Sequence, residues 1–314
     1  MALPYNTIES FVQNKVMKVL VDNIFNHTIV LNRFLKKAQK WRGGRNIEVP
    51  IEYGKNTNAE SYSGSATLTT NETEFATKVS LPPRQYNAAI VVTGIELEEN
   101  KGDAAVLDLM KYKLKNAENS LKDLFATDFY ATQSGTKLDG VGGIFAATSG
   151  TPYGGIDPAD FSGWKSNGGD GKRDLSSGNL TLAILQEEFN KCKNGTDKPT
   201  LSVTTDSIWA GIEANLIEAN KRYTDKQLAN LGFENITFRG VPIVADDYCP
   251  DGDFYFFKEN YLRFYVFPGM NFKYIPAQYP TNQDIKVSHI RWYGNLICTN
   301  LARQGLITGI AGVA

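Results

Sequence analysis

Side chains that commonly carry out catalysis are scarce in this sequence, which has two histidines and three cysteines among 314 residues. His27 lies in a basic stretch with helical periodicity and His289 in an expected strand. No Ser or Cys motif accompanies either, so a structural role is favoured for both. Cys192, Cys249 and Cys298 lie far apart and form no CxxC pair. They indicate neither a disulfide framework nor a structural zinc site.

The glycine-rich segment at residues 168–172 is similar to a phosphate-binding loop, but the match fails. Arg173 stands where the motif requires Ser or Thr, and Ser166 stands where it requires the first Gly. We therefore expect a polar surface loop here. No G-x-S-x-G nucleophile elbow occurs in the chain.

An acidic cluster near residue 250 is the remaining candidate for chemistry. It comprises Asp246, Asp247, Asp251 and Asp253. As an EF-hand starting at Asp247, it would have Cys249 at the third position and Lys258 at the twelfth, so the calcium motif fails. Acids at a Pro-Asp-Gly turn are common, and the turn is the favoured interpretation. The sequence thus predicts no catalytic residue, no cofactor and no metal.

Composition narrows the class of protein. Hydrophobic residues make up 42% and charged residues 21%, which is typical of a folded protein. The formal net charge of -1 argues against a dedicated nucleic-acid binder. The first residues lack the pattern of a secretory signal, and no apolar run reaches the ~20 residues of a membrane span. We expect a soluble intracellular protein in a reducing compartment.

The charges are distributed unevenly along the chain. Residues 1–45 contain eight basic and two acidic side chains, a net of +6, whereas residues 46–104 contain nine acidic and four basic ones, a net of -5. Solvated helix and strand faces would account for this pattern by chance. Alternatively, the two segments meet, either within one chain or between two chains.

A long polar loop follows the first elements. Residues 11–41 have helical periodicity. Residues 46–53 alternate as a strand with one buried face, and Pro50 places this strand at a sheet edge. Between residues 54 and 77, 14 of 24 residues are Gly, Asn, Ser or Thr. Strand character resumes at 78–81 and, after Pro82-Pro83, at 88–95. The result is a hairpin whose tip far exceeds a normal hairpin loop and must be mobile or ordered from outside.

The strongest periodicity belongs to a helix of roughly 25 residues that includes Leu107, Leu114, Leu121 and Leu124, with Phe125 beside them and Glu118 and Lys122 on the polar face. We expect it to lie across a sheet rather than to form a coiled coil.

Residues 149–178 are rich in turn formers and are expected to be a loop. Beyond them, helices are expected at 182–192 and after an N-cap at Asp206, and strands at 200–204, 238–245, 254–257, 262–267 and 285–293. Aromatic residues between 255 and 267 could stack nucleic-acid bases, but core packing is favoured. The fold class is α+β, and strands from both ends of the sequence may share a sheet.

This order of elements resembles the major capsid protein of tailed bacteriophages, the Hong Kong 97 fold. The Gly140-Val-Gly-Gly-Ile-Phe145 step and the Phe238-Arg-Gly-Val-Pro-Ile-Val244 segment are also similar to such proteins. The resemblance implies an N-terminal arm at 1–45, an E-loop hairpin at 46–99 and an axial domain at 151–262. It implies a peripheral domain at 100–150 and 263–314, which contains the long spine helix.

The resemblance implies a structural protein, not an enzyme. Its function would be self-assembly into hexamers and pentamers of an icosahedral head shell around double-stranded DNA, without sequence-specific DNA binding and without a membrane. The chain would be part of the virion and would assemble in the host bacterial cytoplasm. Separate scaffolding, portal and decoration proteins are possible partners, since no room is left for a scaffolding segment before the arm. Some relatives crosslink a hairpin Lys, but Lys55 is expected to be a solvated side chain.

The charge pattern and the resemblance together give a hypothesis for the inter-subunit contact. Glu60, Glu72 and Glu74 of the hairpin would face basic groups of an adjacent chain, which would set register more than affinity. The candidate basic groups are Lys36, Lys37, Lys40 and Arg42. Two alternatives stay open: an encapsulin-like shell around a cargo enzyme, and a hydrolase or carbohydrate-binding protein that uses the acids at 246–253.

Overall fold

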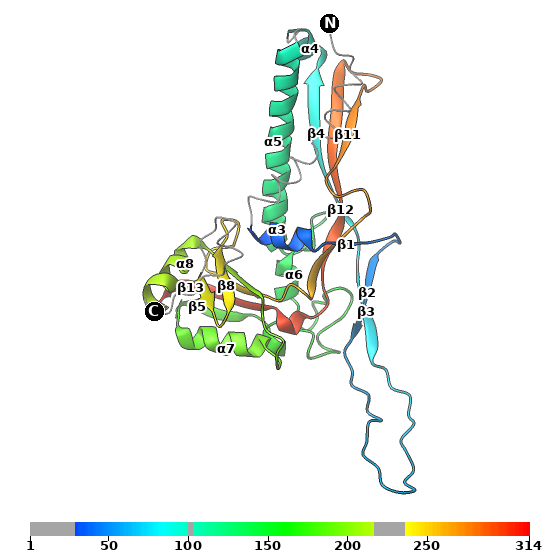
Figure 1. Ribbon diagram of the computed structural model, residues 1–314, viewed down its shortest axis with the longest axis vertical. Coiled ribbons are helices and arrows are strands. Elements are labelled where there is room, and N and C mark those ends of the chain that lie inside the picture. The colour runs from blue at the N-terminus through cyan, green and yellow to red at the C-terminus, as the bar shows by residue number, and fades with distance from the viewer. Residues whose placement is uncertain (1–28, 100–102, 217–235) are drawn as a thin grey trace.

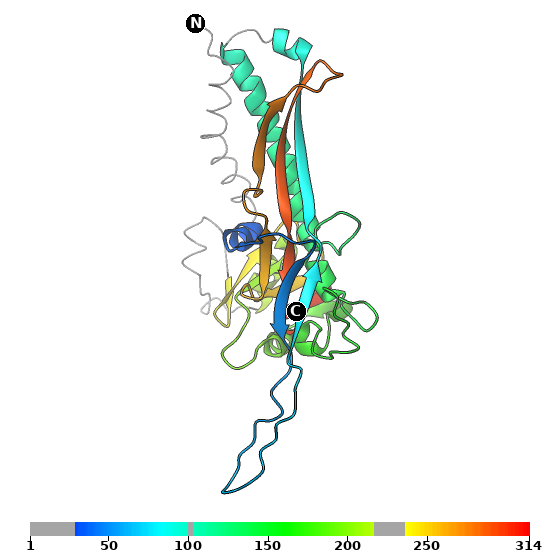
Figure 2. The same ribbon diagram turned by 90° about the vertical axis from the view of Figure 1, so that its right-hand side faces the viewer.

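The computed structural model describes residues 29–99, 103–216 and 236–314. Figures 1 and 2 show an elongated molecule with three parts: a long helix beside a narrow sheet, a second sheet with its own helices, and a protruding hairpin. His27 and residues 11–28 of the first expected helix lie outside the described residues. None of the helices in the described part of the chain combines the length and hydrophobicity needed to cross a membrane.

A five-stranded sheet joins the two ends of the sequence. Its path runs β1 (Gln39–Lys40), β10 (Leu262–Val266), β12 (Ile285–Cys298) and β11 (Lys273–Gln278), and β4 (Arg84–Thr93) also pairs with β12. The β4–β12 ladder is antiparallel over ten residue pairs, from Ile285↔Thr93 to Gly294↔Arg84. The expectation that strands from both ends share a sheet is therefore confirmed.

Helix α5 (Asp103–Tyr130) lies along this sheet, as its periodicity predicts (Figure 1). Phe125 is the centre of the contact, because its ring lies 4.8 Å from that of Trp292 on β12 and 5.7 Å from that of Phe264 on β10. Two details of the predicted faces are wrong. Leu124 is 45% exposed, whereas Glu118 and Lys122 are buried.

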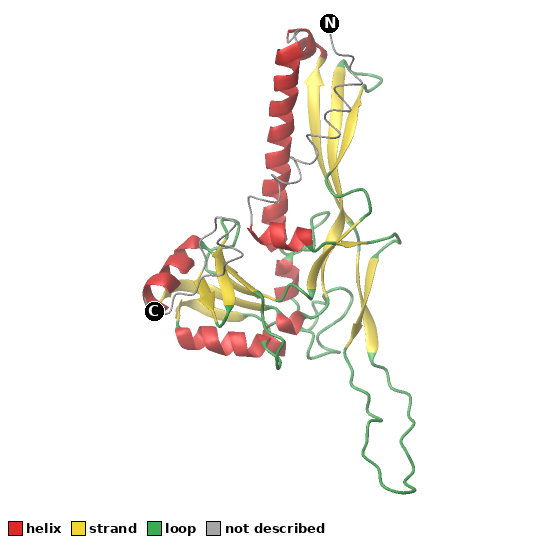
Figure 3. Cartoon of the chain, viewed as in Figure 1, coloured by secondary structure: helices red, strands yellow, loops and turns green. Residues whose placement is uncertain are grey.

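The second sheet has six strands in the order β5-β13-β9-β6-β8-β7. They are β5 (Arg173–Leu180), β6 (Leu201–Thr204), β7 (Ile236–Phe238), β8 (Val241–Ala245), β9 (Phe254–Phe257) and β13 (Gly305–Val313). Helices α7 (Leu182–Cys192) and α8 (Asp206–Gly211) accompany it, and α8 continues as the π-helical segment Ile212–Leu216. Figure 3 shows α7 and α8 at this sheet.

Strand β9 is buried on both faces because the sheet lies between two hydrophobic clusters. Phe254 and Phe256 join the cluster of the α7 side, where Phe256 lies 5.8 Å from Phe189. Tyr255 and Phe257 join the cluster of α5, where Tyr255 lies 5.5 Å from Tyr130. The expected core role of these aromatic residues is confirmed.

The third part is a two-stranded hairpin of β2 (Ile47–Glu52) and β3 (Ala76–Leu81). The register runs from Ile47↔Leu81 to Glu52↔Ala76. Ile47, Ile51 and Val79 are buried. The chain between the strands forms the long loop, which points away from both sheets in Figures 1 and 3.

The helix expected to reach residue 41 ends earlier. The described part of it, α3, spans Ile29–Lys36, and the next residues form β1, parallel to β10. The Trp41 backbone NH donates to the Val266 carbonyl at 3.0 Å, and the Trp41 ring packs against Phe267 at 5.8 Å. Sheet pairing at this edge thus replaces the last helical turn.

The strand expected at 238–245 is a hairpin of β7 and β8 instead. Arg239 and Gly240 both have positive φ, 51° and 75°. Two consecutive residues in this region form the tight turn that matches strand twist. Strand β7 therefore returns along β8, with Phe238 opposite Val241.

Other boundaries also differ from expectation. Strand β4 ends at Thr93, and helix α4 (Gly94–Glu99) follows where strand had been expected to residue 95. The loop expected at 149–178 ends in β5, and the N-cap of α8 is Thr205 rather than Asp206. Strands β11 and β13 were not predicted. Short helices are α6 (Val141–Phe145), η2 (Asn167–Gly169) and η5 (Leu301–Arg303).

The sheets do not follow the predicted division of the chain at two places. Strand β4 pairs with β12, so it leaves the 46–99 hairpin. Strand β13 pairs with β5 and β9, so residues 305–313 lie with the 151–262 segment rather than with the other closing strands.

Candidate inter-subunit surface

The loop at residues 53–75 exposes apolar side chains that its own chain does not cover. Tyr62 is 66% exposed, Leu68 49% and Phe75 54%. The loop has local order: Glu60 accepts hydrogen bonds from the Thr69 backbone NH at 2.7 Å and from the Thr69 hydroxyl at 3.3 Å. Glu60 thus ties the two arms of the loop together.

The other predicted loop residues are free to meet a partner. Lys55, Glu72 and Glu74 are exposed. Within the described residues, none of the three forms an ion pair. Their charge is consequently available to another molecule.

The basic candidates lie at the opposite end of the hairpin from the loop (Figures 1 and 2). Lys36 and Lys37 belong to the end of α3, Lys40 to β1, and Arg42 follows β1; all four are exposed. The described chain pairs none of them with Glu60, Glu72 or Glu74. The two charged sets do not meet within one chain.

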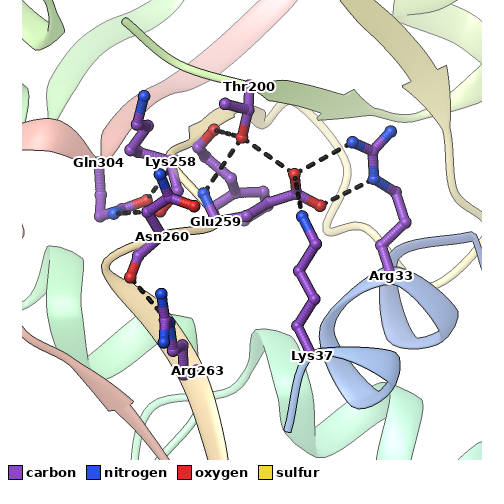
Figure 4. A network of polar contacts seen from close by, with 9 residues as sticks. Arg33, Lys37, Thr200, Lys258, Glu259, Asn260, Arg263 and Gln304 are labelled. Carbon is purple, nitrogen blue, oxygen red and sulfur yellow. Dashed lines mark hydrogen bonds and ion pairs between the residues drawn. The ribbon is translucent and has the colours of Figure 1, made fainter. Parts of the chain in front are cut away.

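Lys37 differs from the other three because its ammonium group already has a partner. Its Nζ donates to Glu259 Oε2 at 3.2 Å, and Arg33 donates to both oxygens of the same carboxylate, at 2.8 and 3.0 Å. The Thr200 hydroxyl adds a third donor at 3.1 Å. Figure 4 shows the two cations of α3 converging on this carboxylate.

This network fastens α3 to the turn between β9 and β10, and the sequence analysis missed it. Glu259 is 3% exposed, so an unpaired charge there would be costly. Burial alone would raise the pKa of its carboxyl, but Arg33 and then Lys37 outweigh burial and hold the pKa below its ordinary value of 4.5. An acid beside aromatic strands was the available signal, but its partners lie more than 200 residues away.

A second polar network fixes the point where the hairpin rejoins the five-stranded sheet. Asn295 on β12 donates to the Pro82 carbonyl at 2.7 Å and also to the Asp139 carboxylate. Arg84 at the start of β4 reaches the same carboxylate at 3.1 Å. Pro82-Pro83 are therefore held between β3 and β4.

The acids at residues 246–253 stabilise a turn and do not converge on a ligand site. Asp246 accepts from the Tyr130 hydroxyl at 3.0 Å and from the Tyr248 backbone NH at 3.0 Å. Asp253 accepts from the Tyr255 hydroxyl at 2.8 Å. Across residues 29–99, 103–216 and 236–314, no cluster of three or more His, Cys, Asp or Glu could hold a metal ion.

The three thiols are buried and unpaired. Burial raises the pKa of Cys192 to about 12 and that of Cys298 to about 12, and it also raises the pKa of Cys249. Thiols in this state are poor nucleophiles at neutral pH. His289 lies on β12, and its pKa is lowered by burial and by Arg291.

Comparison with solved structures decides the fold. The backbone superposes on a chain of the cyanophage A-1(L) capsid asymmetric unit with a TM-score of 0.70, at 16% identity, over 90% of this chain and 93% of that one. The chain has the Hong Kong 97 capsid fold. In the terms of that fold, α5 is the spine helix and the β2–β3 hairpin with its loop is the E-loop.

Two further structures have the same fold. The capsid of the native GTA particle matches with a TM-score of 0.60 at 11% identity, over 88% of this chain and 89% of that one. The holo-SrpI encapsulin complex from Synechococcus elongatus matches with a TM-score of 0.53 at 11% identity, over 88% and 86%. No protein-family model matches the sequence, and no curated protein matches it either.

Proposed function

We propose that this chain is the major capsid protein of a tailed bacteriophage, which assembles into hexamers and pentamers of an icosahedral shell around double-stranded DNA. The observation that carries the proposal is the E-loop, which exposes Tyr62, Leu68 and Phe75 and three acids without cover from its own chain. Exposed apolar groups of this size are typical of surfaces that bind another molecule.

The protein is a structural subunit, not an enzyme. This proposal is supported by the buried thiols, by the acids used in a turn, and by the likeness to shell-forming chains. Its place is the virion, after assembly in the bacterial cytoplasm. Its main partners are further copies of itself, with separate scaffolding, portal and decoration proteins and packaged DNA as the others.

Electron microscopy of the purified, expressed protein tests the proposal. Closed shells or rings of capsomers are expected, and a chain that stays monomeric at high concentration with every scaffolding partner supplied would contradict it. The encapsulin-like alternative is separated by the contents of native particles: DNA supports the phage shell, and a protein cargo supports the compartment. The backbone is more similar to the cyanophage and GTA capsids than to the encapsulin.

For the inter-subunit contact, Glu72 and Glu74 remain the best-placed acids, and Lys36, Lys40 and Arg42 the best-placed bases of a neighbouring chain. Lys37 contributes less because Glu259 of its own chain holds it. Glu60 contributes less because it ties the loop. Complementary charge between many identical copies sets register, and the weak contacts add up in a closed array.

Charge reversal tests this contact. Glu72→Lys with Glu74→Lys should impair shell formation, because two like charges then face each other between chains. Adding Lys40→Glu and Arg42→Glu should restore it. Reversal of Asp247 and Asp251, two exposed acids remote from the loop, is the matched control. Normal shells from the first variant, or no rescue by the second pair, would sink the assignment.

A further inference from the structure

We infer that residues 153–164 form a bracket that presets the direction of the E-loop hairpin, and that this direction limits the rate of shell assembly. The second half of this inference rests on the proposed function. A two-stranded hairpin is only marginally stable alone and has no sheet neighbour to orient it. Contacts with the body of the molecule must therefore fix its angle.

The bracket is rooted in the five-stranded sheet. The hydroxyl of Tyr153, a buried side chain, accepts a hydrogen bond at 3.0 Å from the backbone NH of Cys298 on β12. Tyr153 and Ile156 exchange two backbone hydrogen bonds, at 3.1 and 3.2 Å. The Trp164 indole donates to the Tyr153 carbonyl at 3.2 Å, which closes the segment on itself. One end of the bracket is thus a fixed part of the core.

The bracket holds the hairpin first at β3. The Ser80 backbone NH donates to the Gly154 carbonyl at 2.9 Å. Gly154 has a φ of 62°, and the space that a Cβ would need is filled by the Val79 side chain. Only glycine allows this backbone conformation together with so close an approach.

The second hold lies nearer the loop, on the other strand. The Phe161 ring contacts the Tyr53 ring edge to face, with centroids 4.4 Å apart and an angle of 62°. Tyr53 directly follows β2, and its strand pairs Val49 with Val79. The two holds are therefore about 13 Å apart along the hairpin, at four residues of ~3.3 Å each. Two separated holds on different strands prevent rotation about either one.

Between hairpin and bracket lies a cavity of about 430 Å³, lined by residues that include Thr77, Trp164, Asn300 and Arg303. The space is not filled by side chains, so the hairpin could tilt into it once the Phe161 hold is lost. A preset angle lowers the entropy cost of association, because each incoming copy presents its E-loop already in the binding orientation. The bracket therefore acts before assembly, in the free subunit.

Spin-label distances in the free subunit test the first half of the inference. Labels at Glu52→Cys on β2 and Asp170→Cys on the body occupy exposed sites, and the native thiols are buried. A narrow distance distribution is expected for the parent chain and a broad one for Phe161→Ala. Asp160→Ala, an exposed neighbour in the same segment, is the control and should leave it narrow. An unchanged distribution in Phe161→Ala would overturn the bracket.

Gly154→Ala should broaden the same distribution more strongly. Because it may also disturb folding, Phe161→Ala remains the deciding variant. Its near-native circular dichroism and melting temperature are checked first.

Assembly kinetics test the second half. Light scattering should show shells of Phe161→Ala forming about tenfold more slowly than those of Asp160→Ala, since a population shift of this size lowers the competent fraction in proportion. Equal rates with a broadened distance distribution would overturn the link to assembly. A parent chain that forms no shells would instead contradict the proposed function, while the distance result would stand or fall by itself.

Discussion

At the scale of single residues, the structure assigns Glu259 a role in anchoring α3. Its carboxylate is buried and has two cationic partners, whereas the Glu48–Lys78 pair on the hairpin is exposed on both sides. Buried, hydrogen-bonded pairs are strongly destabilised when one partner is removed, and exposed pairs contribute little.

We predict that Glu259→Gln lowers the free energy of unfolding by about 3 kcal/mol, because two buried cations lose their counter-charge. The matched change Glu48→Gln should cost less than about 0.5 kcal/mol. Urea titrations of both variants measure the difference. Similar losses in the two variants would contradict the anchoring role.

The same anchor has a defined pH dependence. The folded-state pKa of Glu259 is lower than the unfolded value near 4.5, so its contribution is complete above that value and is lost as the pH falls through the folded-state pKa. Hydrogen exchange of the α3 amides should therefore accelerate below pH 4.5 in the parent chain. In Glu259→Gln it should be fast already at pH 7.

Glu118 on α5 has the opposite sign. Burial raises the pKa of its carboxyl to about 6, and the nearby Lys122 only partly offsets this. The folded state thus binds the proton more tightly than the unfolded state, and ionisation of Glu118 destabilises the fold above pH 6. We predict that Glu118→Gln raises the melting temperature at pH 7.5 and changes it less at pH 4.5. A gain that is equal at both pH values would argue against this titration.

At the scale of elements, the stability of the five-stranded part depends on how α5 meets the sheet. Phe125 contacts Trp292 and Phe264, while its neighbour Leu124 is 45% exposed. We predict that Phe125→Ala costs 3–5 kcal/mol and Leu124→Ala about 1 kcal/mol or less. Denaturant unfolding of the two single variants checks which face of α5 is the core face.

The long helix could be predicted because its apolar residues recur at steps of three and four over many turns, and tertiary contacts only refined its faces. The strands that escaped prediction have weak patterns. Strand β5 is polar, β11 contains Pro276, and β13 contains three glycines. Each becomes a strand through its partner: β5 pairs with β13, and β11 pairs with β12.

Local turn chemistry explains the β7–β8 error. A single Gly in an apolar run suggests a bulge, and the left-handed Arg239 that completes the turn has no signature of its own. The candidate surface divides in the same way. The exposed loop followed from composition, whereas the capture of Lys37 by Glu259 depends on a contact between distant segments that periodicity cannot reveal.

At the scale of the whole molecule, the E-loop and the folded body serve different ends. The loop at 53–75 lies outside the two hydrophobic clusters, and its exposed residues contribute little to the core. Stability of the free chain should therefore be insensitive to it.

We predict that replacing residues 54–75 by a two-residue Asn-Gly turn, which closes β2 and β3 directly, leaves the melting temperature of the free chain within about 2 °C. Shell formation should be abolished, because the surface offered to neighbouring copies is removed. Calorimetry and electron microscopy of the same preparation measure the two effects. Intact shells from the shortened chain would refute the role given to the loop.

The positions of β12 and β13 also have a consequence for the order of events during translation. Strand β12 is the common partner of β4, β10 and β11, and β13 lies between β5 and β9. Both strands are synthesised after all their partners. Neither sheet can close until residues 285–313 have left the ribosome, although the hairpin emerges much earlier. A nascent chain would thus carry its E-loop for most of its synthesis on an unfinished body, and its bracket, rooted on Cys298, would become functional only when translation of this region is complete.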